Sequence, residues 1–181
     1  MGRKAPKGEC DLSERNPIRS RIEEDPVDHI DEAMALVHAY WLSKANGRFA
    51  PTWSDIDLLG LPPAYIPYVV VCDVLPDNDY RFRYWGRGHA DYYGEDYTGR
   101  LLSDISPDWA QEHLRIQYDR VVEARHPLAY TIEYENLATP VYSYRAPLSD
   151  DGQHVTAIFS VVDRKIVRDS MRAWYFAGAN E

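Results

Sequence analysis

The chain has 181 residues, a length typical of one domain with short extensions. Hydrophobic residues make up 45% and charged residues 27%, which is the composition of a globular chain rather than a disordered one. Lys+Arg 20 against Asp+Glu 29 gives a formal net charge of -9 at pH 7, and this excess of acidic residues disfavours nucleic acid as a partner.

The cysteines and the hydropathy of the sequence indicate the cellular compartment in which we expect the protein. Cys10 lies in a polar stretch and Cys72 in an apolar run far along the chain, so a disulfide framework is excluded. No run of about 18 apolar residues is present for a membrane span, and the basic start, residues 1–7, lacks the apolar stretch of a secretory signal. We therefore expect a cytoplasmic protein without a membrane partner.

The N-terminal part divides into a tail and a helix. Residues 1–27 are predicted to be a flexible polar tail, because almost no large apolar side chains occur up to Asp25. Residues 28–47 are predicted to form an amphipathic helix that ends at Asn46-Gly47. Its apolar face has spacings of three and four and consists of Ile30, Ala33, Met34, Val37, Tyr40 and Trp41.

The main domain is predicted to span residues 48–165, followed by a C-terminal extension at 166–181 in which a helix begun at 164 can continue to 176. Four glycines between residues 86 and 105 favour short helical turns, and Ser106-Pro107 favours the start of a long helix that ends before Pro127. Strands are predicted at 68–74, 80–85, 128–135, 140–148 and 154–163, the first two forming a hairpin. This order predicts an α+β fold, a five-stranded antiparallel sheet with helices on one face.

Specific segments add a family resemblance. Two short segments come first in the chain: Asp55-Ile-Asp-Leu-Leu-Gly-Leu-Pro-Pro63 and Val70-Val-Cys-Asp-Val74. A longer and more specific segment follows: Phe82-Arg-Tyr-Trp-Gly-Arg-Gly-His-Ala-Asp-Tyr-Tyr-Gly94, continued by Asp96-Tyr-Thr-Gly-Arg-Leu-Leu-Ser-Asp-Ile105. From about residue 33 to 163 the chain resembles a PAS sensory domain, in particular the small proteobacterial proteins made mostly of one PAS domain. The resemblance implies a pocket between the sheet and the helical layer. It also implies an N-terminal helix that packs on the open sheet face or pairs with a second subunit.

The resemblance implies a stand-alone sensory or signalling domain without catalytic activity. We expect it to bind a small, mainly apolar molecule or a protein partner, to form a homodimer, and to act through a downstream signalling protein. The ligand and any cofactor are left open. A covalent flavin photocycle is disfavoured, because the helical stretch has no cysteine.

Alternating side chains suggest where a ligand would bind. If the strand faces that carry Phe82, Tyr130 and Tyr144 share one side of the sheet, they surround a cavity against the long helix. Arg145 and the apolar trio Trp85, Ile158 and Val162 then belong to the outer face. The predicted ligand-binding residues are Phe82, Tyr84, Tyr92, Trp109, His113, Tyr130, Tyr144 and Phe159. The alternative is a tyrosine-rich core without a ligand.

Haem binding, acid-base catalysis and cation binding are the alternatives to a simple ligand pocket. His113 lies on the helix equivalent to the one that carries the haem ligand in haem-binding PAS domains, so a haem-binding sensor is an alternative. His89 is either a second polar group near the pocket or a loop residue. A small enzyme using Tyr and His in acid-base catalysis would need a titratable pair in the cavity. The acidic pairs are interpreted as turns and helix caps rather than as a cation site. These pairs are Asp55/Asp57, Asp77/Asp79 and Asp150/Asp151.

Overall fold

The computed structural model describes residues 20–25, 27, 32–77, 79–134 and 140–163, and the fold is α+β. Within these ranges the six-stranded sheet has the order β1-β4-β5-β6-β2-β3, with antiparallel neighbours throughout. The strands are β1 (Ser20–Asp25), β2 (Val69–Val74), β3 (Tyr80–Trp85), β4 (Leu128–Tyr134), β5 (Val141–Leu148) and β6 (Ala157–Asp163). The α-helices are α1 (Glu32–Ala45), α2 (Arg87–Tyr93) and α3 (Asp108–Ala124), and the 3-10 turns are η2 (Trp53–Asp55), η3 (Leu58–Gly60), η4 (Ile66–Tyr68) and η5 (Leu102–Asp104).

The predicted antiparallel α+β architecture is confirmed, but the strand count of five is wrong. β2 to β6 lie at the five predicted positions, and the predicted hairpin of β2 and β3 is present. The extra strand, β1, lies in the predicted tail and pairs with β4 at the sheet edge. Its sequence has one large apolar residue, Ile22, so the backbone ladder stabilises it more than side-chain burial does. Residues 1–19 and 164–181 lie outside the described residues.

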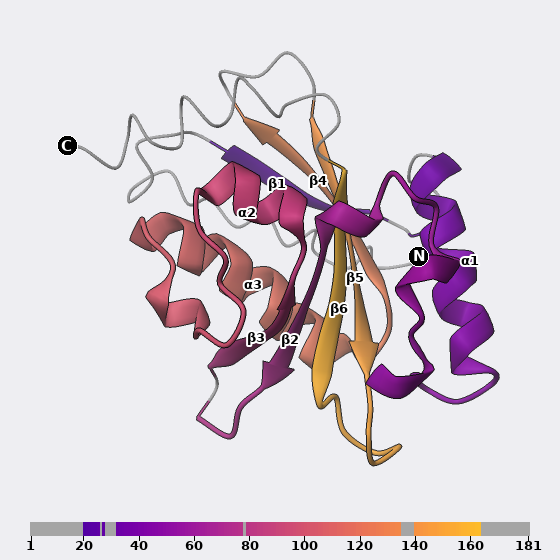
Figure 1. The fold of residues 1–181 in the computed structure, drawn as a ribbon. Helices are drawn as coiled ribbons and strands as arrows, with labels where there is room; N and C mark the ends of the chain where they lie inside the picture. The colour runs from indigo at the N-terminus through magenta and orange to yellow at the C-terminus, as the bar shows by residue number, and fades with distance from the viewer. Residues whose placement is uncertain (1–19, 26, 28–31, 78, 135–139, 164–181) are drawn as a thin grey trace, which may run out of the picture.

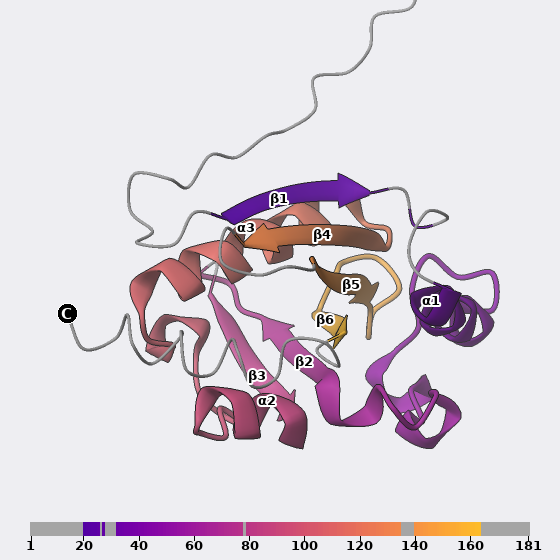
Figure 2. The ribbon, with the colours of Figure 1, turned by 90° about the horizontal axis from the view of Figure 1, so that it is seen from above.

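Helices cover both faces of the sheet: α2 and α3 share one face, and α1 covers the other, where the resemblance implies an N-terminal helix. Figure 1 shows α2 and α3 on one side and α1 on the other, and the view from above in Figure 2 agrees. The α3-side core includes Cys72, Phe82 and Tyr118. The α1-side core includes Trp41 and Tyr144. Burial on both faces explains why β5 and β6 have almost no exposed residue.

A bulge between β2 and β3 decides which side chains share a face. Val71 pairs with Tyr84, whereas the next residue, Cys72, pairs with Phe82, so β3 has one extra residue at this point. Phe82 therefore packs in the α3-side core, while Tyr84 packs against the α1-side core. Simple alternation had placed these two rings on the same face.

The acidic pair Asp55/Asp57 acts as caps in the connector between α1 and β2. The Asp55 carboxylate accepts hydrogen bonds from the backbone N–H of Thr52 at 2.8 Å and from Arg48 at 2.8 Å. Asp57 accepts from the N–H of Leu59 at 3.0 Å and caps η3. The prediction of caps is confirmed for both residues. Among the described residues no group of three or more His, Cys, Asp or Glu is arranged to hold a metal ion.

The Asp55 cap predicts a change of stability at acid pH. The hydrogen bonds from Thr52, backbone first, and from Arg48 lower the pKa of Asp55 from 3.8 to about 2. Because the folded pKa is lower than the unfolded one, the ionised carboxylate stabilises the fold above about pH 4, and this contribution is lost as pH falls through about 2. In Asp55→Asn, which still caps but does not titrate, we expect the urea midpoint to fall less steeply between pH 5 and 2. Equal slopes in both proteins would contradict the assignment.

Candidate ligand-binding site

An internal cavity lies between the sheet and the layer formed by α2 and α3. Its interior volume for water-sized molecules is about 40 Å³, enough for about three waters. The sheet contributes Val70, Trp85, Ile132, Tyr134, Val141, Ser143, Arg145, Ser160 and Val162. The helices contribute His89, Tyr93, Trp109, Ala110, His113, Leu114, Gln117 and Tyr118.

A buried arginine forms the polar centre of the cavity. Arg145 on β5 is only 3% exposed. Its Nε donates to Gln117 Oε1 at 2.8 Å, and its Nη1 donates to Ser160 Oγ at 3.0 Å. The guanidinium lies over the Tyr118 ring, 4.8 Å from the ring centroid. All of these partners are neutral, so the hydrogen bonds and the cation–π contact orient the charge without neutralising it.

Sheet register and helix periodicity bring these partners together. Arg145 is directly opposite Ser160 in the ladder of β5 and β6, so both side chains lie on the α3 side. Gln117 is fully buried one turn after His113 on α3, and its Nε2 donates to the His113 carbonyl at 3.0 Å. This bond directs the amide oxygen of Gln117 toward Arg145. Ser143 Oγ donates to the same oxygen at 3.4 Å.

Aromatic rings form the wall toward α2. The Trp85 ring packs against Tyr93 at 5.3 Å and against His89 at 5.2 Å between centroids. Trp85 Nε1 is buried without a hydrogen-bond acceptor among the described residues. Gly86, directly before α2, lies close to the η4 backbone, since a Cβ there would lie 2.4 Å from the Pro67 carbonyl oxygen.

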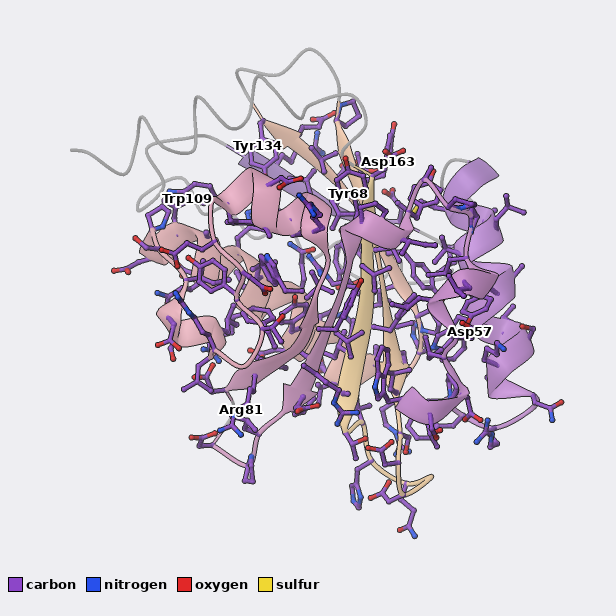
Figure 3. The ribbon with its side chains drawn as sticks, in the orientation of Figure 1. Asp57, Tyr68, Arg81, Trp109, Tyr134 and Asp163 are labelled. Atoms are coloured by element: carbon purple, nitrogen blue, oxygen red, sulfur yellow. The ribbon has the colours of Figure 1, made fainter. Side chains whose placement is uncertain are left out.

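The wall nearest the surface is formed by α3 and β4. The rings of His113 and Tyr134 stack with centroids 6.2 Å apart and planes at 21°. Trp109 and Tyr134 are half-buried and are labelled in Figure 3, where they project from α3 and β4. His113 itself is 4% exposed. An entering molecule would pass these rings before it reached Arg145.

Burial keeps the Cys72 thiol and the phenols of Tyr118 and Tyr130, all in the α3-side core, protonated. Desolvation raises the pKa of the Cys72 thiol to about 12, and the positive charge of Arg145 opposes this effect only partly. Desolvation also raises the pKa of Tyr118 and of Tyr130 above the ordinary value of 10.0. None of these three groups titrates near neutral pH, so they are hydrogen-bonding groups rather than proton-transfer groups.

The structure brings together only part of the predicted ligand-binding set. Trp109 and His113 line the cavity. Phe82 and Tyr130 belong to the same core but lie outside the lining. Tyr84, Tyr144 and Phe159 pack on the opposite, α1 side of the sheet, and Tyr92 lies on α2, with its side chain outside the described residues.

Two placements on the sheet are corrected. Arg145 was expected on the outer face, but it is buried at the centre of the cavity. The apolar trio Trp85, Ile158 and Val162 was also expected on the outer face. These residues share the side of Arg145, as predicted, but that side is the one covered by α3. Their face was assigned wrongly because both faces of β5 and β6 are buried, and alternation then gives no direction. The sequence feature that could have indicated the buried position of Arg145 is that it is the one charged residue in β5.

Comparisons with family models, with curated proteins and with solved structures find no match to the chain. No helix within the described ranges is both long and apolar enough to cross a membrane. The functional argument therefore depends on the cavity and its residues.

Proposed function

We propose that the chain is a PAS-type sensory domain that binds a small molecule in the cavity between α3 and the sheet. The element order supports this proposal: two strands, short helical segments, one long helix and three strands. The position of the cavity also supports it, because the resemblance implies a pocket between sheet and helical layer. The observation that carries the proposal is the buried polar centre, Arg145 with Gln117 and Ser160, in contact with internal space.

A binding role is favoured over a catalytic one. Tyr84 and Tyr144, the tyrosines first considered for an acid-base pair, pack on the other side of the sheet. Two other pairs of histidine and tyrosine do line the cavity, His113 with Tyr134 and His89 with Tyr93, so the preference for binding rests on the groups around Arg145. The phenol and thiol nearest Arg145, Tyr118 and Cys72, have pKa values raised by burial. A haem is also disfavoured, because space for about three waters is far less than the macrocycle occupies.

The proposed output passes through a second subunit and a downstream protein. α1 leaves Leu36 57% and Leu42 50% exposed on the side of the sheet opposite the cavity. We propose that a homodimer forms through this helix, as the resemblance implies. The ligand site and the subunit contact would then lie on opposite faces of one sheet.

Native mass spectrometry, compared with the denatured mass of the same sample, tests ligand and subunit number together. We expect a dimer with a reproducible non-covalent extra mass. Ala110, 4% exposed in the cavity wall, provides a blocking variant: Ala110→Leu should remove the extra mass. Ala64→Leu, at an exposed position outside α1 and outside the cavity wall, is the matched control and should retain it. An apo protein whose melting temperature responds to no compound of a metabolite library would contradict the proposal.

A further inference from the structure

We infer that the ligand of this cavity is a small organic carboxylate, a monoanion whose charged group binds Arg145 and whose short apolar body contacts the surrounding rings. This inference rests on the proposed function and specifies the ligand class of the same site. It replaces the expectation of a mainly apolar ligand.

The first argument is the uncompensated charge. A buried ion normally has a partner of opposite charge, because removing an ion from water is costly. Arg145 is 3% exposed, yet no carboxylate lies within 4.0 Å of its guanidinium among the described residues. The described lining contains neither Asp nor Glu, although the whole chain has a formal net charge of -9. The cavity is therefore a cationic site in an acidic protein, and an anionic ligand would provide the missing partner.

The second argument is the geometry of the free donors. A guanidinium has five N–H groups, and Nε and one N–H of Nη1 are used by Gln117 and Ser160. The second N–H of Nη1 and both of Nη2 have no acceptor among the described residues. These two nitrogens form the end of the planar fork that matches the two oxygens of a carboxylate. A single cation balances a single negative charge, which favours a carboxylate over a phosphate dianion.

The third argument concerns the rest of the ligand. The walls around Arg145 include Trp85, Tyr93, Trp109 and the stacked pair His113 and Tyr134. Such rings bind an apolar or aromatic body. Trp85 Nε1, buried without an acceptor among the described residues, is a further donor in this lining for a ligand oxygen. The interior volume of about 40 Å³ limits the body to a short chain, since a benzene ring occupies a cavity of about 150 Å³.

The test compares acids with their uncharged amides. Acetate and propionate are titrated against acetamide and propionamide by calorimetry, with wild type, Arg145→Met and Arg81→Met. The exposed Arg81 on β3 gives the same change of net charge away from the cavity. We expect at least one acid to bind wild type and Arg81→Met about 10- to 100-fold more tightly than its amide, and Arg145→Met to lose this preference. Arg145→Met should fold, since an apolar side chain of similar length removes a buried charge.

The outcomes separate the two proposals. Equal binding of acid and amide, unaffected by Arg145→Met, overturns the carboxylate inference and leaves the ligand-binding function standing. Competition by inorganic phosphate as strong as that of the acids also overturns it. If no probe binds, the co-purified mass decides: a carboxylic acid supports the inference and a neutral compound overturns it. If there is also no co-purified mass, the carboxylate inference fails, and the proposed function fails with it when no compound of the metabolite library raises the melting temperature.

Discussion

Replacing Tyr144 with alanine is expected to lower the free energy of unfolding by about 3–5 kcal/mol. Tyr144 is fully buried in the α1-side core, and its hydroxyl shares a hydrogen bond of 3.0 Å with His38 Nδ1 on α1. Burial raises the pKa of Tyr144 well above 10.0, so the hydroxyl remains protonated. Its removal leaves a large cavity and separates α1 from β5. Urea unfolding followed by tryptophan fluorescence measures the loss.

Tyr144→Phe separates the hydroxyl from the ring. It keeps the packing and removes only the bond to His38, so we expect a loss of about 0.5–1.5 kcal/mol. Because the ring lies on the side opposite the cavity, ligand binding by Tyr144→Phe should equal that of wild type. A stable Tyr144→Ala that loses only ligand binding would instead support the hypothesis that this ring lines a ligand pocket.

Gln117→Leu should lower the free energy of unfolding by about 2–4 kcal/mol, although leucine has a similar size. The substitution removes the oxygen that accepts from Arg145 Nε at 2.8 Å, and it leaves a buried guanidinium with one fewer partner. It also removes the donor to the His113 carbonyl. A ligand-free sample must be used, because a bound anion would stabilise Arg145 independently.

A double-mutant cycle tests the origin of this loss. In the Gln117→Leu background, Arg145→Met removes the unsatisfied charge and should restore most of the lost stability. Arg145→Met alone is expected to be neutral or stabilising. If the two substitutions are additive, Gln117 does not stabilise the fold through Arg145. The same cycle, repeated with a bound acid, shows whether the ligand replaces Gln117 as a partner.

The elements were more predictable than the side of the sheet on which each residue lies. Turn residues such as Asn46-Gly47 and the apolar runs of β2 and β6 predicted element positions correctly, because these signals are local. The bulge at Val71/Cys72 depends on pairing between strands, so alternation along β3 alone placed Phe82 and Tyr84 on one face. β1 is polar and is stabilised by β4, which no pattern within residues 20–25 shows.

The site was only partly predictable for the same reason. Trp109 and His113 were identified from helical spacing and from the resemblance. Arg145 was placed outside because a charge is usually exposed, and a buried position requires partners from elsewhere in the chain. Gln117 and Ser160 supply them from α3 and β6, 28 and 15 residues away. Only the folded register shows that these side chains meet.

Adjacent residues of β5 connect the two layers of the molecule. Tyr144 contacts α1 through His38, and Arg145 faces the cavity, so one peptide unit carries a side chain into each core. Close-packed interiors have little free volume in which a strand can shift unnoticed. A displacement of the guanidinium that rotated this peptide unit would therefore also move the phenol on the other side. The sheet and helix α1 would then move together.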